Sequence, residues 1–143
     1  MIECCTFVLM MRFSFLKRLF LPVLLLLLAG CSSYEAPENG MDCGRQFINA
    51  TYQGNFKRAK QLLVPGEGNE QLLSTRFEQP FRSLDGFGKE RLSQSSIHIK
   101  SVQQQGDSVV LLTYQNAYDN KVYTLKCQLQ EGNWKTDLAY SFR

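Results

Sequence analysis

The sequence predicts an α+β protein in which N-terminal helices pack on one face of a four-stranded antiparallel sheet. Three observations lead to this prediction. Residues 41–84 carry apolar side chains at helical spacing, residues 91–143 alternate apolar and polar side chains, and turn-forming residues divide the latter at intervals of about 12 residues. Helices followed by consecutive strands are typical of a domain whose helices cover one sheet face.

Three helical segments are expected within residues 41–84. Apolar residues three and four positions apart fall on one stripe of a helix and mark its buried face. Those residues are Cys43, Phe47 and Ala50 in the first segment; Phe56, Ala59 and Leu63 in the second; and Leu72, Leu73 and Phe77 in the third. Asn55 can cap the second segment, and Pro65 ends it. Pro80 ends or bends the third, and residues 85–88 are expected to form a turn.

Four strands are expected over residues 96–104, 108–118, 121–130 and 133–142. Short turns separate them, so consecutive strands pair as antiparallel hairpins. Alternation assigns one face of the last two strands to the core; these residues are Tyr123, Leu125, Cys127 and Leu129, then Trp134, Thr136, Leu138 and Tyr140. In the first strand Ile97 and Ile99 take the core side and leave His98 outside. Val102 is out of phase with both isoleucines, which predicts a bulge near Ser101.

The second strand is apolar on both faces, which a sheet with one solvated face should not be. One face carries Val109, Leu111 and Thr113, and the other carries Val110, Leu112 and Tyr114. Two explanations fit equally well. Either long neighbouring side chains shield a central strand, or the outer sheet face is covered in a homodimer.

Residues 1–30 are predicted to be an export signal that is no part of the fold. Basic residues precede a charge-free apolar run of 12 residues that ends at Gly30. The run is too short for a membrane-spanning helix, which needs about 20 residues. Residues 28–31, Leu-Ala-Gly-Cys, resemble the bacterial lipobox, in which the signal is cut before a cysteine that carries diacylglycerol. Cys31 is therefore the predicted lipidation site.

The remaining boundaries follow from composition. Residues 1–10 place an acid and an apolar stretch ahead of the basic segment, so they are predicted to be a start-site artefact, with a long N-terminal region as the alternative. Residues 31–40 are polar and are expected to form a flexible tether behind the lipidated cysteine. Residues 41–143 are expected to form one domain, which is long enough for a single core.

Three segments of this domain carry a resemblance to a known superfamily. They are residues 47–63, which span the first two helices, residues 105–110, and the Gly-Asn-Trp-Lys-Thr-Asp-Leu segment at residues 132–138. Together they resemble small lipoproteins with a nuclear transport factor 2-like (cystatin-like) domain, over about residues 41–140. The resemblance implies a curved sheet that forms a cone with the helices. It implies little about activity, because the superfamily includes enzymes, binding modules and dimerisation domains.

Composition and strand phase argue against several functional classes. A single histidine rules out a multi-histidine metal centre, and residues 31–143 hold 13 basic and 12 acidic side chains, so no nucleic-acid-binding face is expected. An acid–base enzyme needs a titratable group beside its substrate, whereas strand phase places His98 and Asp137 on polar faces. No catalytic residue, metal or cofactor is therefore predicted.

The inward faces suggest a pocket and a disulfide. The residues expected to line the pocket are Tyr114, Tyr123, Trp134, Thr136 and Tyr140. Such a lining suits a small apolar ligand held by hydroxyl groups, or else a packed core. Cys43 and Cys127 both point inward, so they can form a disulfide in an oxidising compartment; the alternative is two buried thiols.

The predicted function is that of a lipid-anchored protein of the bacterial cell envelope whose domain binds a small apolar ligand or an envelope protein without catalysis. Two alternatives stay open: a small isomerase, cyclase or hydrolase of the same superfamily, and a structural envelope component. The expected partners are the membrane, through diacylglycerol on Cys31, and a second copy, through the outer sheet face. Ser32 after Cys31 favours the outer membrane under the enterobacterial sorting rule.

Overall fold

The computed structural model describes residues 35–142. The predictions that concern residues 1–34, among them the export signal and the lipidation of Cys31, lie outside the described residues. The part from Ala36 onward is one compact unit, Ala36–Arg143. No helix within residues 35–142 combines the length and apolar character needed to cross a bilayer.

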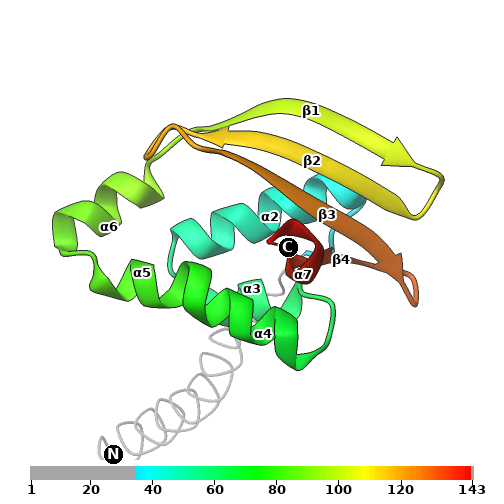
Figure 1. Cartoon of the computed structure of the whole chain (residues 1–143), viewed down its shortest axis with the longest axis horizontal. Coiled ribbons are helices and arrows are strands. Elements are labelled where there is room, and N and C mark those ends of the chain that lie inside the picture. Colours follow the sequence, from blue (N-terminus) through cyan, green and yellow to red (C-terminus); the bar gives the residue numbers. More distant parts are fainter. Residues whose placement is uncertain (1–34, 143) are drawn as a thin grey trace, which may run out of the picture. The chain divides into compact units, whose positions relative to one another are not determined.

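The structure confirms an α+β architecture, with the helices on one side of a single sheet (Figure 1). The helical part comprises α2 (Gly40–Tyr52), α3 (Phe56–Gln61), α4 (Glu67–Leu73), η1 (Ser74–Glu78), α5 (Gln79–Ser83) and α6 (Gly86–Ser93). The sheet comprises β1 (Ile97–Gln105), β2 (Val109–Asn116), β3 (Val122–Gln130) and β4 (Asn133–Asp137), and is followed by the short helix α7 (Leu138–Ser141).

The four strands form an antiparallel meander in the order β1-β2-β3-β4. The register between β1 and β2 shifts between Ile99 and Ser101, which confirms the predicted bulge. Because of this shift, Val102 pairs with Leu112 and faces the same side as Ile99, which pairs with Tyr114. At the opposite edge, β4 is covered by a backbone contact with the chain after α3, where the Thr136 amide donates to the Leu62 carbonyl at 2.7 Å.

The core lies between α2 and the sheet, and close backbone approach makes it dense. The α2 residues Cys43, Phe47 and Ile48 are at most 1% exposed, as are Leu112 and Leu125 of the sheet. A Cβ atom at Gly44 would lie 2.6 Å from the Leu112 Cδ2 atom, so a larger residue there would have to displace the Leu112 side chain. Burial of a side chain such as Phe47 or Leu112 stabilises the folded state by about 1.5–3 kcal/mol.

The helices between residues 72 and 93 differ from the expectation. Of the two outcomes expected of Pro80, an end or a bend, the first does not occur, because the π-helical turn η1 leads directly into α5, which reaches Ser83. Proline cannot donate to the carbonyl four residues earlier and its ring crowds that group, and the wider turn accommodates both effects. The expected turn at residues 85–88 is instead the start of α6, since the Asp85 carboxylate accepts the Gly88 amide at 2.7 Å and caps the helix.

Two further strand predictions are corrected. The fourth strand stops at Asp137, whose carboxylate accepts the Tyr140 amide at 3.2 Å and starts the single turn of α7. Tyr140 is therefore 40% exposed and not part of the inward strand face. Ile99 is also outside the core, at 39% exposure, because α2 packs on β2, β3 and β4 and leaves the edge strand β1 largely uncovered.

The two cysteines of the domain face each other across the core. Both are fully buried free thiols, and the Thr136 Oγ1 atom lies 3.6 Å from the Cys43 sulfur and 3.8 Å from the Cys127 sulfur. A hydrogen bond from the Cys127 thiol lowers the pKa of Cys43, and the same contact raises the pKa of Cys127. The disulfide is not formed in this structure and stays a prediction.

We expect Cys43 and Cys127 to become a disulfide after export, because hydrogen-bonded thiols in an oxidising compartment are well placed for thiol–disulfide exchange. On the chain-entropy account, closing a loop of about 84 residues would stabilise the protein by roughly 4–5 kcal/mol. Maleimide labelling of the denatured, exported protein should then require prior reduction. A Cys43→Ala variant, which leaves Cys127 as the one thiol of the domain, should label at Cys127 without reductant. Equal labelling of the wild type with and without reductant would show that the thiols stay free.

Candidate functional site

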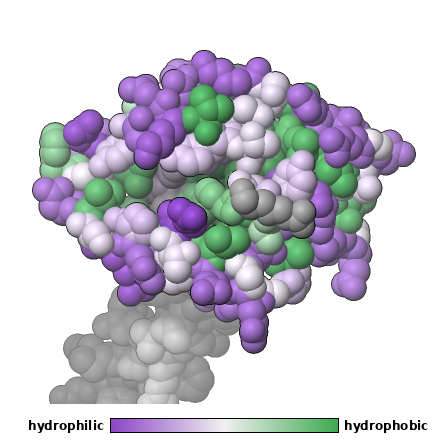
Figure 2. Space-filling view, in the orientation of Figure 1, coloured by the Kyte–Doolittle hydropathy of each residue, from purple (hydrophilic) through white to green (hydrophobic). Residues whose placement is uncertain are grey.

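A cavity of about 440 Å³ lies between the helices and the end of the sheet where β2 turns into β3. In Figure 2 a recess with hydrophobic residues at its margins opens on this face. Its lining is rich in aromatic side chains: Tyr52, Phe77, Phe81, Tyr114, Tyr118, Tyr123 and Phe142. The volume and the apolar lining with few polar groups are typical of a small-molecule site.

The floor of the cavity is formed in part by the π-helical turn η1. Arg76 and Phe77 both belong to this turn and both line the cavity. The Phe77 ring makes edge-to-face contacts with Phe47 of the core, at 5.6 Å between centroids, and with Phe142, at 5.7 Å. Single π-helical turns are frequent at functional sites because they redirect side chains within a helix, and here the turn presents one cation and one ring to the cavity.

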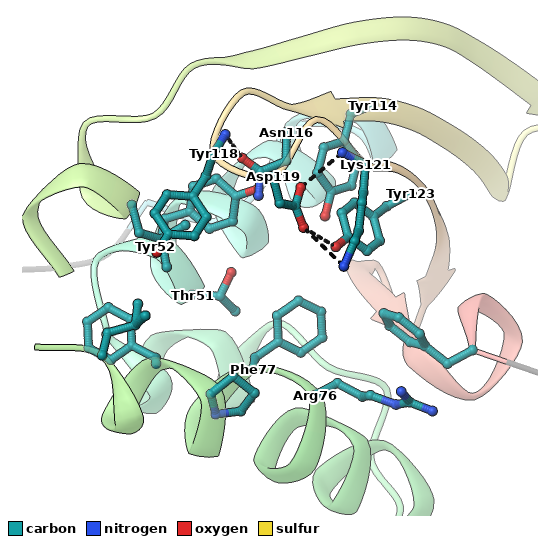
Figure 3. A pocket seen from close by; sticks show the side chains of 15 residues that line it. Thr51, Tyr52, Arg76, Phe77, Tyr114, Asn116, Tyr118, Asp119, Lys121 and Tyr123 are labelled. Carbon is teal, nitrogen blue, oxygen red and sulfur yellow. Dashed lines mark hydrogen bonds and ion pairs between the residues drawn. The ribbon is translucent and has the colours of Figure 1, made fainter. Parts of the chain in front are cut away.

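The opposite wall is formed by the turn between β2 and β3, which carries Tyr118, Asp119 and Lys121 (Figure 3). Side-chain hydrogen bonds fix the shape of this turn. The Asn116 Oδ1 atom accepts the Tyr118 amide at 2.7 Å, and the Asp119 Oδ1 atom accepts the Lys121 amide at 3.0 Å. Asn120 adopts a left-handed φ of 57°, which asparagine tolerates better than most residues.

Asp119 also connects this turn to the tyrosines of the cavity. Its Oδ2 atom accepts a hydrogen bond of 2.7 Å from the Tyr123 hydroxyl and lies 3.9 Å from the Lys121 Nζ atom. The Tyr123 ring stacks on that of Tyr114, with 5.5 Å between centroids and 27° between planes. Burial, followed by the hydrogen bond to Asp119, raises the pKa of Tyr123 to about 12. Tyr123 is therefore a hydrogen-bond donor at neutral pH rather than a base.

Tyr52 carries a polar group that the folded chain does not satisfy. The side chain is 7% exposed, it lines the cavity, and its hydroxyl has no hydrogen-bond partner within the part of the chain that the structure describes. Burial, the largest effect, raises the pKa of both Tyr52 and Tyr114, so Tyr52 keeps its proton at neutral pH. The Tyr114 hydroxyl lies near enough to act on Tyr52 as a hydrogen-bonding neighbour, which opposes this rise in pKa for Tyr52 and adds to it for Tyr114, but the pair does not reach ordinary hydrogen-bond geometry.

The structure separates the residues that the sequence grouped as a pocket lining. Tyr114 and Tyr123 line the cavity, whereas Trp134, Thr136 and Tyr140 do not. Trp134 packs at the start of α2, beside Gly40, and Thr136 is buried between the two cysteines.

The two residues weighed as catalytic groups also lie outside the cavity. Asp137 caps α7 and lies 3.5 Å from the Lys126 Nζ atom, so it has a structural role. His98 is exposed, as expected, and borders a second, more open groove with Arg45 and Asn49 of α2. Neither groove nor cavity brings His98 and Asp137 together.

Several residues of the site escaped sequence reasoning. Asp119 follows the second strand in a polar turn, where an aspartate is ordinary, and its sequence position does not reveal that the same carboxylate binds Tyr123. Tyr52 lies near the end of the first helical segment, and no local pattern in the sequence marks its hydroxyl as unpaired. Arg76 and Phe77 line one cavity because of the π-helical turn. Pro80 signals a disturbance there, but not the direction in which the side chains turn.

The cavity holds no arrangement suited to a metal. Within residues 35–142, no cluster of three or more His, Cys, Asp or Glu side chains is placed to bind an ion. The chemistry that the described side chains offer is hydrogen bonding from tyrosines, stacking on rings, and the charges of Arg76, Asp119 and Lys121.

Comparison of this chain with known protein families, with curated proteins and with solved structures finds no match in any of the three. The functional argument therefore depends on the geometry of the site.

We predict that the protein loses stability above about pH 10. Tyr52, Tyr114 and Tyr123 have folded-state pKa values above the unfolded value of about 10. As the pH rises, the unfolded chain loses these protons first, so the stabilisation present below pH 10 declines. For the two buried tyrosines the slope is up to about 1.4 kcal/mol per pH unit each.

Urea unfolding between pH 8 and pH 11 measures this slope. Tyr114→Phe should reduce the slope, and Tyr140→Phe, which removes an exposed tyrosine, is the matched control. An unfolding free energy that stays constant up to pH 11 would contradict the prediction.

Proposed function

We propose that this chain is a lipid-anchored protein of the bacterial cell envelope whose domain binds a small, ring-bearing apolar ligand in the aromatic cavity, without catalysis. One observation carries the ligand-binding part: Tyr52 lines the cavity, and its buried hydroxyl has no hydrogen-bond partner in the described part of the chain. A buried donor that stays unpaired costs about 1–3 kcal/mol. A ligand with a hydrogen-bond acceptor removes this cost when it binds.

The nature of the lining supports a ring-bearing ligand. Aromatic side chains from α5, β2, β3 and the η1 turn converge on one space, and each offers a face or an edge for ring stacking. The edge-to-face pair of Phe56 and Phe81, at 5.5 Å between centroids, keeps one wall in place when the cavity is empty. Preorganised walls favour binding because few side chains have to be ordered by the ligand.

The envelope location is proposed from the sequence. The basic segment, the apolar run and the Leu-Ala-Gly-Cys motif at residues 28–31 together support lipidation at Cys31 and anchoring, with Ser32 favouring the outer membrane. The polar tether at residues 31–40 would let the domain stand off the membrane. The nuclear transport factor 2-like cone belongs to the same proposal, and the order of helices followed by an antiparallel meander is compatible with it.

An enzymatic role is the second candidate, and Asp119 is the observation that favours it. Its carboxylate lines the cavity and could accept a proton from a ligand. However, its oxygens already accept hydrogen bonds from Tyr123 and from the Lys121 amide, so it is engaged in holding the turn. Recovery of a bound compound distinguishes the two roles, because an enzyme converts the compound on incubation and a binding protein returns it unchanged.

A homodimer through the outer sheet face also stays a proposal. Val109 and Leu111 of β2 are only half-exposed in the single chain. Long side chains flank them on the neighbouring strands, since Gln103 and Lys126 pair with Leu111. This arrangement supports the shielded-strand explanation, and the more exposed Val122, at 59%, is the residue of this face that a partner would cover.

For the anchor, we predict that Cys31→Ala abolishes incorporation of a palmitate analogue, because the Cys31 thiol is the proposed acceptor of the acyl-bearing group. Metabolic labelling in the producing cells measures this directly. Cys43→Ala is the matched control and should keep the label, since Cys43 is buried in the core. Undiminished labelling of the Cys31 variant would refute lipidation at this site.

For the cavity, we predict that Tyr52→Phe weakens binding of 2-naphthylmethanol, a neutral ring compound with one hydroxyl, by about 2- to 10-fold. That range corresponds to the loss of one hydrogen bond worth about 0.5–1.5 kcal/mol. The same variant should leave the ligand-free protein as stable as the wild type or more stable, because the removed hydroxyl has no partner. Calorimetric titration and urea unfolding measure the two effects.

Two tryptophan variants test where the compound binds. Leu84→Trp places a large ring in the cavity and should abolish binding, whereas Phe87→Trp adds the same ring at a position that is 69% exposed and does not line the cavity. If 2-naphthylmethanol does not bind the wild type, or binds both tryptophan variants equally, the proposed site is wrong.

A further inference from the structure

Cationic side chains surround the aromatic cavity. Arg76 and Lys121 line it. Two more cations lie over lining rings: the Lys89 Nζ atom is 5.8 Å from the centroid of Phe81, and the Arg91 Cζ atom is 5.5 Å from that of Tyr118. These four side chains come from the η1 turn, from α6 and from the β2–β3 turn, so the positive charge is contributed by three separate segments.

The acids nearby do not balance this charge. Asp119 is the one acid among the lining residues, and it is bound by the Tyr123 hydroxyl. The neighbouring acids of the α5–α6 region have other contacts and lie outside the lining. Glu78 forms an ion pair with Arg82, Asp85 caps α6, and Glu90 accepts a hydrogen bond from Gln94.

Arg76 is the cation that is most available to a ligand. Within residues 35–142 it forms no ion pair, and its recorded contact is with the face of the Phe142 ring, 5.8 Å from the Cζ atom to the centroid. Lys121 is held only weakly by Asp119, because the pair is 3.9 Å apart and the lysine side chain is 71% exposed. In Figure 3 Arg76 and Lys121 both lie on the side of the cavity away from Tyr52.

We propose that the ligand of this cavity is an aromatic carboxylate, with its ring among the tyrosines and phenylalanines and its acid group at Arg76 and Lys121. The proposal rests on the proposed function, that the cavity binds a ring-bearing ligand, and adds the charge of that ligand. The planar guanidinium of Arg76 suits a carboxylate, to which it can donate two parallel hydrogen bonds. A cationic ligand would meet like charges at the same place.

The test compares two compounds that share a ring system and differ in charge. The full-length protein in detergent is titrated with 2-naphthoate and with 2-naphthylmethanol at low salt, and binding to Leu84→Trp is subtracted as micelle partitioning. We expect the carboxylate to bind about tenfold more tightly than the alcohol, which is about 1.4 kcal/mol. The preference should shrink at high salt, because Arg76 and Lys121 are exposed.

Variants of Arg76 assign the preference to that side chain. Arg76→Gln should bring the two compounds to similar affinity, because it weakens binding of the carboxylate far more than binding of the alcohol. Arg76→Lys keeps the charge and should retain part of the preference. This variant shows whether the loss in Arg76→Gln comes from the missing charge or from a folding defect. Arg82→Gln, which removes a cation that is paired with Glu78 and lies outside the cavity, is the matched control and should behave like the wild type.

The outcomes distinguish failure of the charge inference from failure of the proposed ring-binding function. Equal binding of the acid and the alcohol to the wild type would overturn the charge inference and leave the ring-binding cavity intact. A tenfold preference that survives Arg76→Gln would also overturn it. Tighter binding of decanoate than of 2-naphthoate would show that the acid is aliphatic, as in a fatty acid. Failure of the alcohol to bind at all would count against the proposed function itself.

Discussion

The close packing of α2 against the sheet is the constraint on which the rest of the structure depends. At its N-terminal end the helix carries Gly40 and Gly44, and a Cβ atom at either would lie within 2.6 Å of Val110 or Leu112 on β2. At its C-terminal end it carries Thr51 and Tyr52, which line the cavity. The same helix thus packs closely on the sheet at its N-terminal end and contributes side chains to the cavity at its C-terminal end. The size of its residues decides where the two layers touch and where space remains.

The difference between the two ends of α2 also explains which parts of the fold can be predicted from the sequence. The spacing of Cys43, Phe47 and Ala50 and the alternation along β3 depend on local periodicity, so the helices, the strands and the buried face follow from them. The bulge near Ser101 could be predicted because Val102 breaks a two-residue period. The end of β4 could not be predicted, since Asp137 continues the alternation of the strand while its carboxylate starts α7.

The cavity is a tertiary property, which is why sequence reasoning found only part of it. Tyr114 and Tyr123 were predicted because they point inward from strands, and they stack on each other within the site. The other essential groups come from a helix end, a π-helical turn and a hairpin turn that lie far apart in the chain. Tyr140 was wrongly placed on the inward face of a strand, because a change from strand to helix within one residue leaves no periodic signal.

The cavity also shows why its residues need not be those that stabilise the fold best. The fully buried thiols and Thr136 satisfy one another at the tight end of α2, whereas the hydroxyl of Tyr52 is buried without a partner at the open end. A chain selected only for stability would carry phenylalanine at position 52, since the ring would fill the same space without an unpaired donor. This unpaired hydroxyl is the observation on which the proposed ligand site rests. The same reasoning applies to Arg76, whose guanidinium lies over the Phe142 ring at the rim of the cavity and forms no ion pair within the described residues.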